Sequence, residues 1–244
     1  MPRKKPQSEA EFLAGYDPSV YERPSLTVDV ALLSVVDDAL ATLLVRRAEH
    51  PWEGAAALPG GFVRIDESIE RAAERVLADK AGLEGVFLEQ LYTFGDVERD
   101  PRTRVVTVAH YALVDGKRFE ALDRGLTARL EVPWEGETGG PVDVRVDGAI
   151  TELAFDHADI LGMAVKRIRG KLDYTPIGFQ LLPPRFTLRQ LQRVHEVVLD
   201  RPLNKDSFRR RMLASGQLEA TGERQRDVDH RPAALYRFVR RSAV

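Results

Sequence analysis

LPGGFVRIDESIERAAERVLADKAGL, residues 58–83, carries the strongest structural pattern in the chain. It opens on a pair of glycines and ends in a run with the i, i+3, i+4, i+7, i+8 spacing of one buried helical face, formed by Ile69, Ala72, Ala73, Val76 and Leu77. Asp66 is the expected N-cap of a helix over 67–81, and Gly82 stands where a C-cap glycine belongs. The stretch therefore predicts a glycine turn followed by an amphipathic helix packed on a core.

The composition is that of an ordinary globular protein. The chain has 244 residues, of which 43% are hydrophobic and 30% are charged. With no cysteine, disulfides, thiolate catalysis and sulfur-ligated zinc are excluded. No apolar run approaches the ~20 residues that span a bilayer, and the basic start MPRKKPQSEAEF lacks the apolar region of a secretory signal. We expect a cytoplasmic protein with no membrane partner, built of one large domain or two unequal ones.

The charge is distributed unevenly along the chain. The formal net charge is −2, but residues 181–244 hold 14 Lys and Arg against 7 Asp and Glu, a net charge of +7. The remainder therefore carries a net charge of −9. A small basic segment joined to an acidic body indicates a polyanion partner for that segment, although a merely soluble charged surface gives the same count.

The first two thirds of the chain mix strand and helix patterns. Residues 1–22 are polar and read as a loosely ordered lead-in. Strands are predicted over 25–36, 41–48, 89–95 and 105–114, with a further strand or loop at 141–150. A helix is predicted over 157–172 and a proline-marked joint over 173–185. This order predicts an α/β or α+β body.

Beyond residue 185 the pattern changes. Thr187 and Gln190 form a capping-box pattern at the start of a helix that ends near residue 199. A tight turn and a short basic helix over 205–215 follow, and then two β-like runs at 218–222 and 234–239. Helix, turn, basic helix and β-hairpin is the order of a winged helix-turn-helix.

The stretch GFVRIDESIERAAERVLADKAGL, residues 61–83, resembles the Nudix box. In that box a Gly, five residues, a Glu and seven residues precede Arg-Glu-apolar-x-Glu-Glu-x-Gly-apolar. Six residues match at the fixed spacing, namely Gly61, Glu67, Arg75, Leu77, Gly82 and Leu83. The resemblance implies a Nudix sandwich with a mixed sheet.

The departures from the box concern its metal ligands. Where the box has three further glutamates, this chain has Val76, Asp79 and Lys80. Nudix hydrolysis uses Mg²⁺ or Mn²⁺, hard cations that need several oxygen ligands. Val76 has no lone pair, and Lys80 places an ammonium where the cation would bind. We therefore predict no metal, no cofactor and no catalytic residue. We also predict that Lys80 holds a diphosphate in place of the metal ion. The alternatives are that Val76 only faces the core and that Lys80 is only a solvated charge.

Segments 22–33 and 91–114 resemble the ADP-ribose-binding branch of the Nudix fold. The resemblance implies aromatic residues such as Tyr92 and Phe94 for stacking a base, and loop arginines for reaching phosphates. Strand-core aromatics and solvated arginines are the alternatives. The candidate ligand-binding residues are Gly61, Arg64, Glu67, Lys80, Tyr92, Arg99 and Arg102, with Arg104 as a further loop arginine.

The basic helix over 205–215 is the candidate reader of DNA. Phe208 and Met212 are expected to face a small core, which directs basic side chains outward to a major groove. The loop over 223–233 is placed for backbone or minor-groove contact. The alternative is a charged interaction domain. The candidate DNA-binding residues are Arg189, Lys205, Arg209, Arg210, Arg211, Arg224, Arg226 and Arg231.

A degenerate Nudix domain followed by a winged helix resembles the Nudix-related transcriptional regulators, bacterial repressors of NAD metabolism and, in some branches, of sugar catabolism. The resemblance runs from about Tyr21 onward and implies a lead-in over 1–22, an effector domain over 23–174 and a DNA-binding domain over 175–244. It implies a homodimer on an inverted-repeat operator in double-stranded DNA, controlled by ADP-ribose or a related phosphorylated metabolite. The alternatives are an ADP-ribose hydrolase with a DNA-binding tail, and a scaffold whose tail binds RNA or protein.

Overall fold

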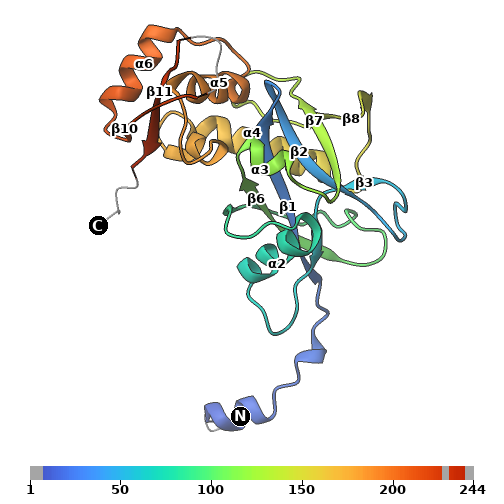
Figure 1. Cartoon of the computed structure of the whole chain (residues 1–244). Helices are drawn as coiled ribbons and strands as arrows, with labels where there is room; N and C mark the ends of the chain where they lie inside the picture. The colour runs from blue at the N-terminus through green and yellow to red at the C-terminus, as the bar shows by residue number, and fades with distance from the viewer. Residues whose placement is uncertain (1–7, 227–230, 240–244) are drawn as a thin grey trace.

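The computed structural model of the chain describes residues 8–226 and 231–239. The strands of the body are β1 Ser25–Val36, β2 Ala39–Arg46, β3 Ala56–Ala57, β4 Gly60–Phe62, β5 Phe87–Phe94, β6 Val105–Leu113, β7 Leu126–Glu131, β8 Asp143–Val146 and β9 Ala149–Ile150. They form one mixed sheet in the order β5-β6-β1-β2-β7-β8-β9, with β3 beside β2 and β4 beside β1 (Figure 1). The predicted α/β or α+β body is confirmed.

Strand β1 is the axis of this sheet. It pairs antiparallel with β2 and β4 and parallel with β6. Asp37 and Asp38 link β1 to β2 with φ angles of 45° and 59°, which match the twist of a two-residue hairpin turn. The structure confirms strands at the positions predicted over 25–36, 41–48, 89–95 and 105–114, and it resolves 141–150 into β8 and β9.

Helix α2, Ile69–Ala81, covers one face of the sheet. Its buried residues Ala72, Ala73, Val76, Leu77 and Ala81 pack on Val28, Val30 and Leu32 of β1. The predicted start was wrong: the helix begins at Ile69 with Ser68 as N-cap, because the Ser68 hydroxyl accepts the Arg71 N–H at 3.2 Å. Gly82 ends the helix at φ 67°, the left-handed C-cap expected of it.

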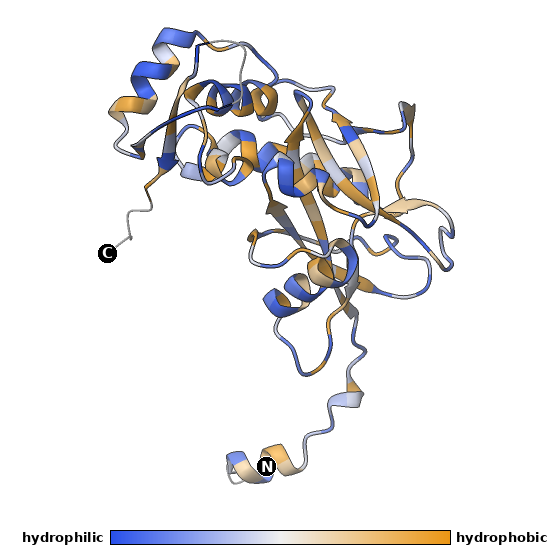
Figure 2. Cartoon of the chain, in the orientation of Figure 1, coloured by the Kyte–Doolittle hydropathy of each residue, from blue (hydrophilic) through white to orange (hydrophobic). Residues whose placement is uncertain are grey.

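Helix α4, His157–Lys171, covers the other face and extends the core toward the C-terminal part of the chain. Its apolar residues belong to one hydrophobic cluster with Tyr111 and Leu44 of the sheet and with Phe186 and Leu191 of the C-terminal segment. Figure 2 shows apolar residues concentrated on the central strands and polar residues along the helix nearest the C-terminus. One hydrophobic core therefore connects the sheet with the C-terminal segment.

The C-terminal segment is a winged helix. The 3-10 turn η2 Pro176–Leu181 leads into α5 Leu188–Leu199, then α6 Lys205–Ala214 and the hairpin β10 Leu218–Arg224 with β11 Ala234–Phe238. The predicted capping box is confirmed, since the Thr187 N–H donates to Gln190 Oε1 at 2.8 Å and the Gln190 N–H donates to Thr187 Oγ1 at 3.1 Å. Phe208 is buried and Met212 partly buried, as expected.

Arg169 of α4 forms hydrogen bonds to both the winged helix and the body. Its side chain is buried, Nε donates to the Val198 carbonyl at the end of α5 at 2.8 Å, and Nη1 donates to the Trp134 carbonyl at 3.0 Å. Burial lowers the pKa of Arg169. At the periphery Arg193 of α5 forms an ion pair with Asp38 at the β1–β2 turn. The two contacts hold α5 against the body, one near the end of the helix and one near its middle.

Residues 8–20 have more regular structure than their composition suggests. Residues 9–14 form a short helix, α1 Glu9–Ala14, followed by the 3-10 turn η1 Pro18–Val20. Ser8 and Glu11 form a capping box at the start of α1. The remaining helix, α3 Gly116–Glu120, caps one end of the sheet. Within residues 8–226 and 231–239, none of the helices is long and apolar enough to cross a membrane.

We expect Arg169→Met to destabilise the protein by about 2–4 kcal/mol, because the buried carbonyl of Val198 and the partly buried carbonyl of Trp134 lose a donor. Urea unfolding measures this change. Arg145→Met is the matched control, because the ion pair of Arg145 with Glu131 is on the surface. Its loss should lower the free energy of unfolding by no more than about 0.5 kcal/mol. Equal unfolding midpoints for the two variants would contradict the role of Arg169.

Candidate functional site

A cavity of about 430 Å³ opens beside β1, where β2 ends and the Gly60–Gly61 turn begins. The loop over 95–104 and the start of α4 form its other walls. Five basic residues line it, namely Arg46, Arg47, Lys80, Arg99 and Arg102, together with the aromatic rings of Phe62 and Phe155. A larger open groove of about 580 Å³ lies on the outer side of α2, but the smaller cavity holds the cations and the glycine turn and is the candidate ligand pocket.

The glycine turn lies in close contact with its neighbours. A Cβ at Gly60 would lie 2.1 Å from the Asp29 Oδ1 atom and 3.1 Å from the Val28 carbonyl. A Cβ at Gly61 would meet a methyl group of Val76 at 3.3 Å. Glycine at 60 is therefore what lets the Asp29 carboxylate lie beneath the turn. Val76, at a position where the Nudix box has glutamate, supports the turn from the helix side.

Arg99 is locked by two carboxylates. Its Nε and Nη2 atoms donate to Asp156 at 2.9 and 2.7 Å, and Nη2 lies 3.4 Å from Asp29. Burial lowers the pKa of Arg99, but the hydrogen bonds and charges of Asp156 and Asp29 outweigh it, so the pKa lies above its ordinary value. Arg99 lines the pocket as predicted, yet most of its charge is balanced within the protein. It is better suited to orient Asp29 than to bind phosphate.

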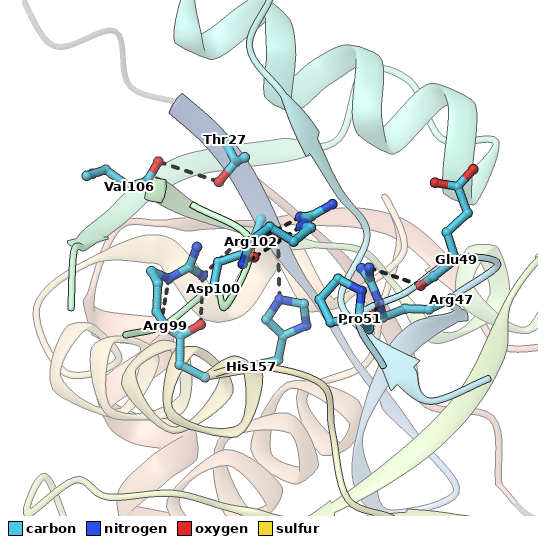
Figure 3. Close-up of polar contacts among 11 residues, drawn as sticks. Thr27, Arg47, Glu49, Pro51, Arg99, Asp100, Arg102, Val106 and His157 are labelled. Carbon is cyan, nitrogen blue, oxygen red and sulfur yellow. Dashed lines mark hydrogen bonds and ion pairs between the residues drawn. The ribbon is translucent and has the colours of Figure 1, made fainter. Parts of the chain in front are cut away.

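His157, at the start of α4, completes this network. Its Nδ1 accepts the Leu58 N–H at 2.9 Å, so the proton is assigned to Nε2, which lies 3.6 Å from Asp29. Burial lowers the pKa of His157, so the ring is neutral at pH 7 and the pair with Asp29 is not an ion pair. Figure 3 shows Arg99, Asp100 and Arg102 together above His157, with Arg47 across from them.

The remaining cations differ in how far they are engaged. Arg102 holds the Asp100 carboxylate through Nε and Nη2 at 3.0 and 2.8 Å, and this contact lowers the pKa of Asp100. Arg47 donates to the Pro51 carbonyl at 2.7 Å and stacks over Phe155. Among the described residues Lys80 has no hydrogen bond or ion pair to the protein. Its ammonium is thus the cation most available to a bound anion.

Three predicted ligand residues lie outside the pocket lining. Glu67 accepts Arg75 Nε and the Arg64 N–H, both at 2.9 Å, and the Arg75 hydrogen bond lowers the pKa of Glu67 to about 2. It therefore fastens the 62–68 loop to α2. The side chain of Arg64 is exposed, and Tyr92 is exposed on the edge strand β5, edge-on to Phe94 at 5.6 Å. Gly61, Lys80, Arg99 and Arg102 do line the pocket, whereas Arg104 caps the Asp96 carbonyl.

Several pocket residues were missed from the sequence. The signal for Asp29 was a lone charge within the apolar run of β1, and the signal for Arg46 and Arg47 was a basic pair that ends β2. His157 and Phe155 have no such signal, because only the fold brings the start of α4 to β1. The aromatic rings that line this cavity are those of Phe62 and Phe155, and Tyr92 is not among its lining residues.

The candidate DNA-binding residues divide into exposed and engaged groups. Lys205, Arg209 and Arg210 of α6 are exposed, as is Arg189 in the first turn of α5. Arg211 instead donates to Asp173 at 3.2 Å and lies over the Phe208 ring. In the wing, Arg224 donates to the Pro232 carbonyl at 3.0 Å. Arg226 and Arg231 are exposed on either side of residues 227–230, which lie outside the described part of the chain.

Two family models match the chain, a NUDIX domain over residues 25–135 and an NrtR DNA-binding winged helix domain over 178–238. The ADPR responsive transcriptional repressor NtrR of Acinetobacter baylyi is 39% identical over 235 residues, which is 95% of this chain and 89% of that protein. The chain belongs to the NrtR family.

Solved structures of the NrtR family agree with this architecture. Shewanella oneidensis NrtR complexed with a 27mer DNA is 35% identical, with a TM-score of 0.72 over 88% of this chain and 93% of that one. The NUDIX domain of the same protein, complexed with ADP ribose, is 35% identical, with a TM-score of 0.52 over 66% of this chain and 99% of that one. The predicted Nudix sandwich and winged helix are both confirmed.

The residues of this NrtR-family pocket do not fit a Nudix metal ion. Val76 is a buried hydrocarbon under Gly61, and Asp79 is turned outward toward Arg75 at 4.0 Å. Lys80 directs a cation at the pocket. Within the described ranges, no group of three His, Cys, Asp or Glu side chains is placed to hold a metal ion. Divalent cations need such oxygen ligands.

We expect Gly60→Ala to lower stability by about 1–3 kcal/mol, because the new Cβ overlaps Asp29 and forces the turn or the carboxylate to move. Gly95→Ala is the matched control, since its Cβ would meet its nearest neighbour at 3.8 Å, an ordinary contact. Thermal unfolding of both variants measures the difference. Equal stability of the Gly60→Ala and Gly95→Ala proteins would contradict the prediction, because it would mean that a Cβ at position 60 fits without moving Asp29.

Proposed function

We propose that this chain is an ADP-ribose-responsive transcriptional repressor. Its winged helix, over about 175–244, binds operator DNA, and its Nudix domain, over about 23–174, binds the effector. The observation that carries the proposal is the combination of two parts in one chain. A winged helix with an exposed basic α6 shares a hydrophobic core with a Nudix domain, and in that domain Lys80 occupies one of the metal-ligand positions of the box and lines the pocket. Similarity over nearly the whole chain to a repressor and to a DNA-bound regulator supports it.

The pocket suits a diphosphate linked to a base and a sugar. Lys80 offers a cation with no ion pair among the described residues, and the side chains of Arg46 and Arg102 line the same pocket. Phe62 and Phe155 provide faces for a base. Asp29, on the pocket floor, can accept hydrogen bonds from hydroxyl groups. ADP-ribose carries each of these groups, and the S. oneidensis relative has been crystallised with it.

We further propose that the pocket binds ADP-ribose without hydrolysing it. Binding needs charge and shape complementarity, whereas turnover needs a group that activates water and stabilises the transition state. At two positions where the Nudix box has a glutamate carboxylate, Val76 has an isopropyl group and Lys80 has an ammonium group. An ADP-ribose hydrolase with a DNA-binding tail remains the second candidate, since the fold itself is that of an enzyme family.

The DNA-binding form is proposed to be a homodimer on an inverted repeat. A 27-mer, the DNA bound by the S. oneidensis relative, spans roughly two and a half turns of B-DNA, and paired half-sites lie one turn or a multiple of it apart. One recognition helix reads only one half-site. Genes of NAD metabolism are the proposed targets, and the cytoplasm is the proposed location.

Effector and DNA are coupled through the shared core. Strand β1 carries Asp29 on the pocket floor and leads to Asp38 at the turn that contacts Arg193 of α5. A ligand that changes DNA affinity must itself bind differently to the DNA-bound protein, by the same factor. Titrating ADP-ribose into the protein–DNA complex tests the proposal, which requires the DNA affinity to change.

We expect Lys80→Ala to weaken ADP-ribose binding by about 10- to 100-fold, the loss of one charge-assisted contact. Isothermal titration calorimetry measures it, and Lys117→Ala, an exposed lysine outside the pocket lining, is the control. Unchanged affinity would remove Lys80 from the site. Release of AMP during the same titration with Mg²⁺ would instead favour the hydrolase.

We expect Arg209→Ala to cost about 1–3 kcal/mol of specific DNA binding. Arg211→Ala in the same helix is the matched control and should cost less, because that side chain is turned to Asp173. Fluorescence anisotropy on a fragment from upstream of the protein's own gene, with unlabelled competitor DNA, measures both. Equal losses would contradict the assignment of the DNA-facing side of α6.

A further inference from the structure

One carboxylate holds the turn between α5 and α6. Glu196, near the end of α5, accepts the Leu203 N–H at 3.0 Å and the Gln192 side-chain amide at 2.9 Å. The same amide donates to the Leu203 carbonyl at 3.0 Å, so both backbone groups of Leu203 are held by side chains of α5. The hydrogen bonds from Leu203 and Gln192 lower the pKa of Glu196. The carboxylate is therefore ionised at neutral pH and attracts cations.

The turn residue held in this way directly precedes the basic helix of the winged helix. Asn204 is the N-cap of α6, and its side chain accepts the Ser207 N–H at 3.0 Å. Leu203 itself is partly buried and packs against the hydrophobic core. Because a capped helix moves as a rigid element, a displacement of Leu203 displaces the start of α6. The exposed side chains of Lys205 and Arg209 move with it.

Glu196 is also linked to the sheet through Arg193. The Arg193 guanidinium forms an ion pair with Asp38 at the β1–β2 turn, and its Nη1 atom lies 3.7 Å from Glu196 Oε2. Among the described residues, Asp38 and Glu196 form ion pairs with no other cation. Strand β1, which ends at this turn, carries Asp29 of the ligand pocket. A chain of side-chain contacts thus runs from the pocket strand to the turn before α6.

The Asp38–Arg193 pair lies in a loosely packed part of the joint between the two domains. Both residues line two open cavities, of about 480 and 410 Å³. The other charged residues that line the larger cavity, besides Glu196, are Arg129, Glu131, Arg169, Asp200 and Arg201. The side chains of Arg193 and Asp38 are 45% and 65% exposed. An ion pair this exposed contributes little to stability, so it can break at small cost when the β1–β2 turn moves.

We propose that Glu196 is a positioning residue for α6 and that Arg193 couples it to the β1–β2 turn. While the Asp38 contact is made, Arg193 is shared between two carboxylates and Glu196 keeps its hydrogen bond to Leu203. When the turn moves and this contact breaks, Arg193 pairs fully with Glu196 and competes with the Leu203 N–H for the carboxylate. The turn before α6 then shifts, and DNA affinity changes. The inference rests on the proposed function and names the contacts that carry the effect of the bound effector to the DNA-binding helix.

Two substitutions at Glu196 test the positioning role. We expect Glu196→Ala to weaken operator binding by about 10-fold, because the Leu203 N–H loses its acceptor. Glu196→Gln keeps an oxygen for that N–H and should restore the affinity to within about threefold of the unmodified chain. Fluorescence anisotropy on the fragment from upstream of the protein's own gene measures both. Unchanged affinity in Glu196→Ala, or equal losses in the two variants, would overturn the inference.

The coupling is measured as the ratio of the operator dissociation constants with and without saturating ADP-ribose. We expect Asp38→Asn, which keeps a residue that tolerates the positive φ of the turn, to bring this ratio about threefold closer to one. Glu196→Gln should have the same effect, and the double variant no more, since both break one chain of contacts. Asp37→Asn in the same turn is the matched control and should leave the ratio unchanged, because among the described residues the Asp37 side chain forms no ion pair.

The outcomes separate this inference from the proposed function. An unchanged ratio in Asp38→Asn, or additive effects in the double variant, would overturn the coupling while ADP-ribose-responsive repression stands. A ratio of one in the unmodified chain would instead count against the proposed function, because ADP-ribose would then have no effect on DNA affinity. In that case the two Glu196 variants still decide whether this carboxylate positions α6.

Discussion

The Asp29 carboxylate beneath Gly60 is the contact on which the ligand pocket depends. It lies on β1, faces the glycine turn, and is approached by Arg99 from the 95–104 loop and by His157 from α4. Four segments far apart in the sequence thus meet at one charged group. A buried charge is stable only where partners compensate it, so these segments must keep their positions together. These contacts hold the floor of the pocket in place, and Lys80, which has no hydrogen bond or ion pair among the described residues, lines the same pocket.

Helix α2 keeps the shape of the Nudix box while several of its metal-ligand positions carry other residues. The Glu67–Arg75 pair and the Gly82 cap keep the loop and helix of the Nudix box in shape. Val76 fills the space under Gly61 that a carboxylate would otherwise occupy, and Lys80 supplies positive charge without a metal ion. The scaffold remains intact because the residues that shape it are distinct from those that would hold metal.

The joint between the two domains is continuous. The apolar side chains of α4 pack on the sheet and on α5 alike, and Arg169 bonds carbonyls on both sides. A linker of polar residues would let each domain move freely. A shared core instead lets a change at the pocket alter the position of α6, since packed interfaces move as units. Under the proposed function, this continuous packing is the route by which a bound metabolite would alter DNA binding.

The sequence by itself determined the order of the elements, the glycine turn with its amphipathic helix, and the winged helix with its capping box. These are local features, governed by hydrophobic period, caps and turns within a few residues of each other. The sequence placed the helix start at residue 67, two residues early. In the structure Glu67 belongs to the preceding loop and bonds to Arg75, a residue eight positions further along that local capping patterns do not take into account.

Only the tertiary structure decided which side chains share a pocket. Tyr92 and Lys80 both looked like ligand residues, but Tyr92 lies on an edge strand with its ring outside the cavity. Asp29 lies more than a hundred residues before Phe155 and His157, so no local spacing could join it to them. The parallel pairing of β1 with β6 and the packing of α4 bring them together. Such contacts arise from the chain's topology, which local patterns do not encode.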